Sequence, residues 1–145
     1  MDFHAFDLLS HYAKEYGHAK IRDAGVSDTA HQICAFLYFH SGVSQDDVAG
    51  ALHLDKTTVA KALSAMQTKG LILRAQNPSN RRKNTLTITD AGRAAIADVV
   101  YVYDEWLEKV SACLTETEQR QFDDYCARML GAAKYMCEEK PYELI

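Results

Sequence analysis

Apolar residues recur at spacings of three and four along most of this chain, which is the pattern of amphipathic helices. Residues 3–22 form the first such stretch, and Asp23-Ala24-Gly25 ends it, with Gly25 suited to follow the last helical residue. Ser27 is a suitable N-cap for a second helix. The residues expected to face inward from that second helix are Ile33, Cys34, Leu37 and Tyr38.

A pair of short helices is predicted next. Ser44 and Asp47 have the spacing of a capping arrangement for the first of them. Asp55 is a strong N-cap for the second. Lys69 and Gly70 close the second helix in the usual order, a cation followed by a C-cap glycine. The two helices and the tight turn between them predict a helix-turn-helix.

A β-hairpin is predicted after this pair. Residues 71–75 form a short apolar strand, and residues 77–80 (Asn-Pro-Ser-Asn) have turn chemistry. Residues 85–88 alternate polar and apolar side chains, as a half-buried strand does. Residues 81–84 are expected to form a polar, basic loop between the turn and the second strand. The hairpin would therefore be a wing with a basic tip.

Two helices are predicted in the last third of the chain. A long helix begins at Thr89-Asp90 and keeps the three-four spacing over about five turns, as far as Leu114. Thr115 and Glu118 form a capping box for the last helix. The flanking helices carry more apolar side chain than the small central module can cover. They are therefore expected to be buried against a second copy of the chain.

The predicted fold is mainly α with a small β-hairpin wing: a winged helix-turn-helix flanked by N- and C-terminal dimerisation helices. The 145 residues are enough for one domain, taken as 1–145. Within it, residues 28–92 are the predicted winged helix-turn-helix and DNA-binding region. Residues 1–25 and 93–140 are the predicted dimerisation helices.

Charge is unevenly distributed along the chain. The whole chain has a formal net charge of −4. Residues 44–93 nevertheless contain eight Lys or Arg and four Asp, a net charge of +4 against −8 for the remainder. A basic module within an acidic frame is typical of a protein that binds a polyanion.

Several function classes are excluded by what the sequence lacks. It shows no phosphate-binding glycine loop, no HExxH or GxSxG motif and no paired catalytic motif, so neither an enzyme nor a cofactor is expected. The four cysteines match no zinc motif and are expected to be free thiols. His4, His11 and His18 share one helix face but lie too far apart for one metal ion. Without a signal peptide or an apolar span, a cytoplasmic protein that does not enter membranes is expected.

DNA contacts are predicted from the helix-turn-helix geometry, because the N-terminal residues of its second helix reach base edges in the major groove. The residues placed there are Lys56, Thr57, Thr58 and Lys61. The threonines could contact a thymine methyl or a phosphate, although threonine is equally ordinary at a helix start. Ser44 and Gln45 open the preceding helix, where a phosphate is favoured.

The basic wing supplies a second set of predicted contacts: Arg81, Arg82 and Lys83. A narrow minor groove attracts such side chains electrostatically. Without the preceding helix-turn-helix, these three residues would be interpreted as part of a solvated loop. Beside a helix-turn-helix they indicate contact with the adjacent minor groove.

The motifs together resemble a known family. Residues 44–59 and 69–72 have the pattern of its helix-turn-helix, and residues 81–92 (Arg-Arg-Lys-Asn-Thr-Leu-Thr-Ile-Thr-Asp-Ala-Gly) that of its wing and the start of its long helix. Residues 114–118 resemble its junction into a final helix. The family is the MarR family of transcription regulators. The resemblance covers nearly the whole chain in element order and is most specific over residues 44–92.

That resemblance implies a homodimeric repressor that binds a pseudo-palindromic operator in double-stranded DNA. It also implies an effector pocket between the first, second and long helices for a small aromatic or phenolic ligand. The residues expected to line it are His11, Tyr12, Tyr38 and Tyr103. One departure is Asn80, which stands two residues before the wing arginine Arg82 where the family usually has an acid. Asn cannot form an ion pair, so the geometry or strength of the wing contact would differ.

Two alternatives remain open at this point. One is a regulator of the same fold that senses oxidants through a thiol, with Cys34 as the candidate. The other is a winged-helix scaffold that binds protein rather than DNA, in keeping with the net acidity and with Asn80.

Overall fold

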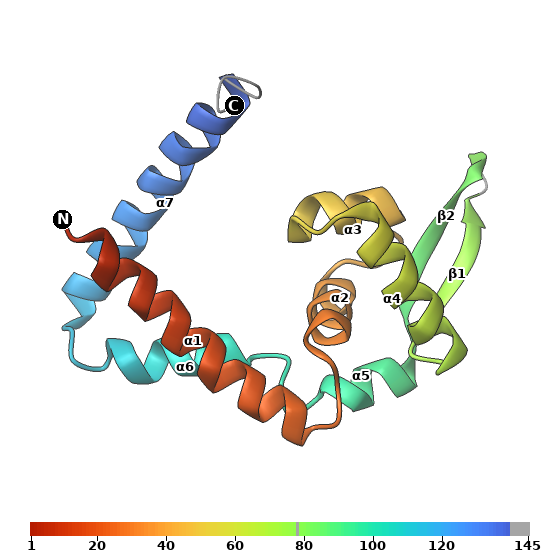
Figure 1. Ribbon diagram of the computed structural model, residues 1–145, viewed down its shortest axis with the longest axis horizontal. Coiled ribbons are helices and arrows are strands. Elements are labelled where there is room, and N and C mark those ends of the chain that lie inside the picture. The colour runs from red at the N-terminus through yellow and green to blue at the C-terminus, as the bar shows by residue number, and fades with distance from the viewer. Residues whose placement is uncertain (78, 140–145) are drawn as a thin grey trace. The chain divides into compact units, whose positions relative to one another are not determined.

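The computed structural model describes residues 1–77 and 79–139, apart from the side chains of residues 80–83, 138 and 139 (Figure 1). The chain divides into two compact units, Met1–Trp106 and Leu107–Ile145. Helix α6 begins in the first and ends in the second. The elements are α1 (Phe3–Asp23), α2 (Asp28–Phe39), α3 (Gln45–Leu52), α4 (Lys56–Thr68), β1 (Ile72–Asn77), β2 (Asn80–Ile88), α5 (Asp90–Ile96), α6 (Val102–Ser111) and α7 (Glu116–Glu139). The predicted mainly helical fold with one hairpin is confirmed.

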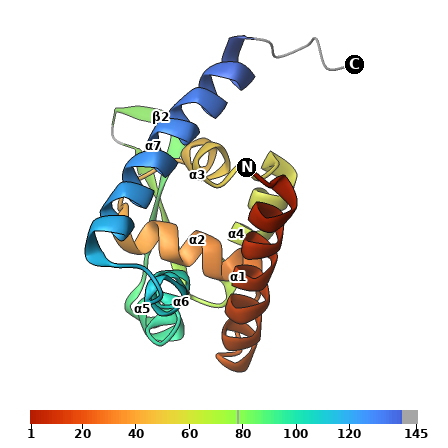
Figure 2. The ribbon, with the colours of Figure 1, turned by 90° about the vertical axis from the view of Figure 1, so that its left-hand side faces the viewer.

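Helix α2 is the centre of the first unit. It packs against α1, α3, α4, α5 and β2, and crosses the middle of the unit in Figure 2. Ile33, Cys34 and Leu37 are fully buried on it, and Tyr38 is half-buried. The side chains that complete this core come from every neighbouring element, among them Ile21, Val48, Val59, Leu63, Ile72, Leu86 and Ile96.

The predicted helix caps are present. Ser27 Oγ accepts the N–H of Ala30 at 3.2 Å. Ser44 and Asp47 form a reciprocal capping box, with distances of 2.9 and 3.1 Å. Thr115 and Glu118 form another at the start of α7. Each of these bonds satisfies a backbone N–H that the helix itself leaves without a partner.

The hairpin is longer than its sequence pattern indicates. Ile72 pairs with Ile88, and the antiparallel register holds as far as Gln76 opposite Asn84, then shifts so that Asn77 faces Asn80. Residues 81–84 were expected to be a loop, and that expectation was wrong, because β2 begins at Asn80. The polar sequence of residues 81–84 is compatible with a strand because this end of the hairpin projects away from the core of the unit (Figure 1).

A short backbone bridge ties the hairpin to the segment before α3. Leu86 N donates to Val43 O at 2.7 Å, and Gly42 N donates to Leu86 O at 3.0 Å. Because Leu86 is also buried in the core, the base of the wing is held to the start of α3 by both backbone and side chain. The sequence pattern did not indicate this bridge.

The long helix predicted from Thr89-Asp90 to Leu114 is interrupted, which corrects the sequence-based expectation. Helix α5 ends at Ile96 and α6 begins at Val102, with turns between them. In an uninterrupted helix, Val99 O would accept the N–H of Tyr103. Instead it accepts from Val102 N at 3.2 Å and from the buried His31 Nε2 at 2.7 Å. A side chain inserted into the helical hydrogen-bond ladder is a known cause of a break.

We expect Gly92→Ala to destabilise the fold by about 1–3 kcal/mol, although alanine is the better helix former. A Cβ on Gly92 would lie 2.2 Å from Leu71 O, a backbone atom that cannot move aside cheaply. The matched control is Gly50→Ala in α3, where a Cβ would meet nothing within 4 Å. That variant should be more stable by roughly 0.5–1 kcal/mol. Denaturant unfolding measures both changes, and a stabilised Gly92→Ala protein would contradict the observed packing.

Candidate nucleic-acid interface

The first turn of α4 is fixed from both sides. Asp55 Oδ1 accepts the N–H of Thr58 at 2.8 Å, and Asp55 Oδ2 accepts the hydroxyl of the same threonine. The hydrogen bond from the Thr58 hydroxyl, and after it the bond from the Thr58 N–H, lower the pKa of Asp55 below its usual value. The cap is therefore ionised at neutral pH. Val59 and Leu63 on the opposite side of α4 are fully buried. The turn is therefore held rigidly at the surface.

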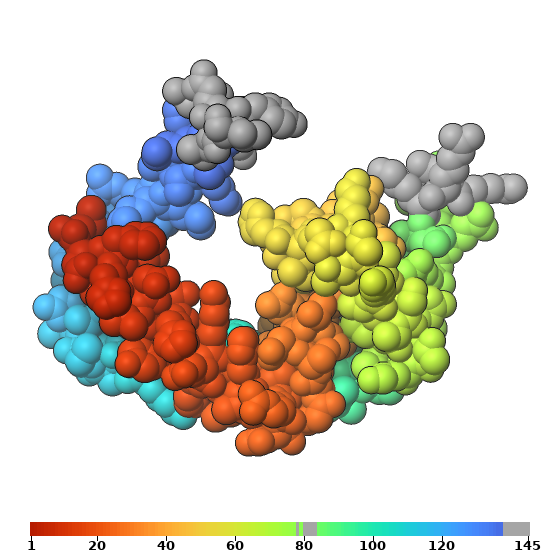
Figure 3. Space-filling view, in the orientation of Figure 1, coloured from red at the N-terminus to blue at the C-terminus, as the bar shows by residue number. Residues whose placement is uncertain are grey.

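Three of the four residues predicted to read DNA from α4 are exposed there: Lys56, Thr57 and Lys61. In the space-filling view, α3 and α4 form one surface beside the hairpin, in yellow and green (Figure 3). Thr58 differs, because it is half-buried and its hydroxyl donates to Asp55. The hydroxyl hydrogen of Thr58 is therefore used in the cap, and the methyl group of Thr58 is the part that could contact a base.

Lys56 links α4 to α3. Its Nζ lies 3.6 Å from Asp46 Oδ1, and both side chains are well exposed. An ion pair this exposed contributes less than about 1 kcal/mol. Lys56 can therefore exchange Asp46 for a phosphate at little cost.

Ser44 and Gln45, the predicted phosphate contacts, lie half-buried at the N-terminus of α3. Gln45 Oε1 accepts a hydrogen bond from Arg74 Nη2 at 3.4 Å, which brings a guanidinium from β1 to this helix terminus. Arg74 Nε is buried and has no hydrogen-bond partner in the described part of the structure. Arg74 was absent from the predicted set because the contact joins residues 29 positions apart.

The backbone of Arg81, Arg82 and Lys83 lies in β2, near the tip of the hairpin. Strand β1 packs against α4, so the hairpin lies beside this helix (Figure 1). The three basic side chains, and that of Asn80, lie outside the described residues. The structure thus brings the backbone of the predicted wing next to α4.

The predicted effector residues do not gather at one place. Tyr103 lines a cavity of about 560 Å³ together with Lys14, His18 and Asp28, and burial and then the charge of Asp28 raise its pKa, which keeps its phenol neutral. His11 lines a smaller cavity along α1, of about 320 Å³, and its Nε2 lies 3.3 Å from Glu15 Oε1.

The other two predicted pocket residues have different surroundings. Tyr12 is exposed on α1. Tyr38 lies under the guanidinium of Arg93, whose carbon is 4.7 Å from the ring centre. The cavity beside Tyr103 combines an aromatic ring, a lysine and a histidine.

Cys34, the candidate redox thiol, is fully buried in the core on α2. Burial raises the pKa of its thiol to about 11. Since the thiolate is the species that oxidants attack, such a thiol is inert at neutral pH. The position therefore argues against a sensing role for Cys34.

Comparison with known proteins identifies the family. The model of the MarR family matches residues 26–83, the segment from just before α2 to the wing. Residues 26–83 of this chain match the MarR family. The crystal structure of MarR itself superposes with a TM-score of 0.76 at 25% identity, over 96% of this chain and 98% of that one. The match agrees with the resemblance of residues 44–92.

Other solved structures and curated sequences are similar to this chain. A Staphylococcus aureus MepR–DNA complex superposes with a TM-score of 0.78 at 24% identity, covering 91% of this chain and 98% of MepR. The uncharacterized HTH-type transcriptional regulator YdgJ of Bacillus subtilis is 26% identical over 72% of this chain and 64% of its own length. The HTH-type transcriptional regulator BilQ of Clostridioides difficile is 26% identical over 54% of this chain. The chain spans only 53% of the length of BilQ.

Two further features are absent from the part of the chain that the structure describes. Among residues 1–77 and 79–139, no helix is long and apolar enough to cross a membrane. Within the same ranges, no group of three or more His, Cys, Asp or Glu side chains is arranged to hold a metal ion.

We expect the Cys34 thiol to be unreactive in the folded protein. At pH 8, a pKa of about 11 leaves about one Cys34 side chain in a thousand as thiolate, and burial blocks access. In a titration with a chromogenic disulfide, Cys34→Ser should release as much thiol as the parent under native conditions. After unfolding it should release one thiol fewer. A loss of native-state reactivity in Cys34→Ser would reopen the redox alternative.

Proposed function

We propose that this MarR-family chain is a transcription regulator that binds double-stranded DNA. The observation that carries the proposal is the N-terminal half of α4, where Lys56, Thr57 and Lys61 are exposed on a helix held by its cap and by the core. Helix α4 would act as the recognition helix in the major groove. A MarR-family neighbour of the same fold, MepR, has been crystallised with DNA.

The surroundings of α4 suit the phosphates on either side of that groove. The N-terminus of α3 presents backbone N–H groups and the Ser44 hydroxyl, and Arg74 lies against it through Gln45. Such a terminus favours an anion. The hairpin beside α4 carries Arg81, Arg82 and Lys83 in sequence, which would follow the adjacent minor groove. These contacts would fix the register of the protein on the duplex.

The functional form would be a homodimer. Helix α1 exposes Phe3, Phe6, Leu9 and Tyr12, with Phe3 81% accessible. Helix α7, in the second unit, exposes its own apolar set, which includes Phe122, Tyr125, Met129, Leu130 and Met136. Apolar surface of this extent on a folded chain supports an interface. Two copies would present two α4 helices to a pseudo-palindromic operator.

Regulation would be repression relieved by a small effector. The cavity beside Tyr103 is lined by Lys14, His18, Asp28 and a neutral phenol, and since Asp28 Oδ2 lies 3.7 Å from His18 Nε2, Lys14 would be the group that pairs with an aromatic or phenolic acid. A ligand there would shift the population of DNA-binding conformations only by its differential affinity for them.

The DNA-binding proposal is tested by measuring affinity for mixed duplex DNA across a salt series, beside Arg82→Ala. Each phosphate contact contributes about −0.9 to the slope of log affinity against log salt. We expect the parent to lose affinity steeply with salt, and Arg82→Ala to give a slope shallower by about one. The control Lys134→Ala removes the same charge from α7 and should leave the slope unchanged. No salt-dependent binding by the parent would favour a protein-binding scaffold instead.

The dimer is tested by sedimentation equilibrium. The parent should have about twice the 16.3 kDa mass of the chain. Phe6→Glu should shift the equilibrium towards monomer, because it places a charge on an exposed apolar site of α1. Gln67→Glu adds the same charge on exposed α4 and should leave the mass unchanged. A monomeric parent at micromolar concentration would contradict the proposal.

A further inference from the structure

Two consecutive side chains join the first turn of α3 to the elements on either side of it. Gln45 accepts a hydrogen bond from Arg74 of β1. Asp46 Oδ1 lies 3.6 Å from Nζ of Lys56, the first residue of α4. The residues that flank these two form the capping box of α3. Asp46 is therefore the carboxylate through which this turn reaches the proposed recognition helix.

Asp46 lies where a negative charge opposes attraction to a phosphate. Its side chain is 64% exposed and that of Lys56 is 78% exposed, so solvent screens the pair and it contributes little to folding. The cation that Asp46 holds is one that the proposed function assigns to the DNA surface. A donor and an acceptor held side by side suit a ligand edge that offers both an acceptor and a donor.

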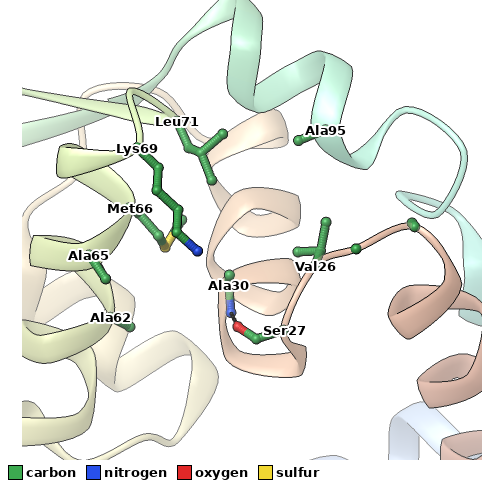
Figure 4. Close-up of a pocket in the computed structure, with 11 residues that line it drawn as sticks. Val26, Ser27, Ala30, Ala62, Ala65, Met66, Lys69, Leu71 and Ala95 are labelled. Carbon is green, nitrogen blue, oxygen red and sulfur yellow. Dashed lines mark hydrogen bonds between the residues drawn. The ribbon is translucent and has the colours of Figure 1, made fainter.

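The pair belongs to the firmly packed half of α4. Asp55 caps this helix, and Val59, one turn after the pair, is fully buried. The loosely filled contact lies in the other half, where Ala62 and Ala65 border a cavity of about 300 Å³ between α4 and α2 (Figure 4). The backbone at Lys56 is thus fixed, and the ion pair restrains its flexible side chain. A side chain held in its binding geometry loses less entropy on binding.

The major-groove edge of a G·C pair offers the matching groups. Guanine presents the acceptors N7 and O6, and cytosine presents the N4 amino donor beside O6. O6 and N4 are hydrogen-bonded to each other, about 2.9 Å apart, so a donor and an acceptor separated by 3.6 Å fit over them side by side. In an A·T pair, the N6 amino group of adenine takes the place of O6, and an ammonium there would face a donor.

We propose that Asp46 and Lys56 together read one G·C base pair in each half of the operator. Lys56 Nζ donates to guanine N7 and O6, and Asp46 accepts from the cytosine N4 amino group. This inference rests on the proposed function and adds the base pair that the start of α4 selects. On other sequences Lys56 leaves Asp46 for a phosphate, and the unpaired carboxylate then disfavours the wrong site.

The test uses the full chain and starts with selection of duplexes from a random pool. Competition binding then compares the selected duplex with duplexes in which each base pair is replaced in turn. For the parent, we expect one position per half-site where G·C is preferred over A·T by about tenfold in affinity. Asp46→Ala and Lys56→Met should each remove most of that preference, at the same position. The double variant should lose little more, because the two residues act as a unit.

Two further variants control for charge and for helix stability. Asp46→Glu keeps the charge and the acceptor oxygens, and should keep the G·C preference. An acid in the first turn of a helix also stabilises that helix through its dipole, and Asp104 has this place in α6. Asp104→Ala is therefore the matched control and should leave every preference unchanged. Thermal unfolding checks that each variant is folded.

A second readout separates base reading from a loss of structure. Asp46→Ala should bind a duplex that lacks the selected site more tightly than the parent does, because Lys56 is then free for a phosphate. A variant that is only destabilised would bind both duplexes more weakly.

The proposal is overturned if Asp46→Ala keeps the full G·C preference, or if the Asp46 and Lys56 variants change different positions. A parent that binds mixed duplex but selects no G·C position overturns this inference alone. A parent that binds no duplex overturns the proposed function as well.

Discussion

Burial of one side of α4 against the core around α2 is the interaction on which the rest of the structure depends. Val59, Leu63 and Met66 are at most 2% exposed, and each such side chain contributes about 1.5–3 kcal/mol when removed from water. Because α4 is pinned along this side, its first turn presents Lys56 and Thr57 outward in a fixed orientation. The hairpin is set beside it by Leu86, which is buried in the same core and bridged to Val43. The candidate DNA surface is thus a consequence of core packing.

The two ends of α4 have different surroundings. One end of the helix carries Lys56 and Lys61, and the other borders a cavity lined by Ala62, Ala65 and the larger Met66. Small side chains at Ala62 and Ala65 leave this part of the packing unfilled, whereas Val59 and Leu63 hold the remainder firmly. The thiol of Cys34, buried on the neighbouring α2, stays protonated at neutral pH because burial raises its pKa to about 11.

Features that depend on residues three or four positions apart could be predicted from the sequence. The caps at Ser27, Ser44 and Asp55 are of this kind, because each joins a side chain to an N–H three residues later. The exposed face of α4 follows from helical spacing alone. The local apolar periodicity of the segment after Asp90 likewise predicted a helix, although not its interruption.

What could not be predicted depends on contacts between distant residues. The helix break requires His31 to reach Val99, 68 positions away, and the pairing of Gln45 with Arg74 requires β1 to fold back on α3. The bridge between Val43 and Leu86 has the same origin. The turn residues near Asn77 indicated a hairpin, yet the ladder continues to Asn80, which no local pattern specified.

The central claim is that α4, the start of α3 and the wing together form a DNA-binding surface. Hydrogen–deuterium exchange of the full chain, with and without saturating duplex, tests it most directly. The account predicts slower exchange in the first turn of α4, at residues 44–47 and along β2, with little change in α7. Protection confined to α1 or α7, or no protection anywhere under conditions where the duplex is bound, would contradict it.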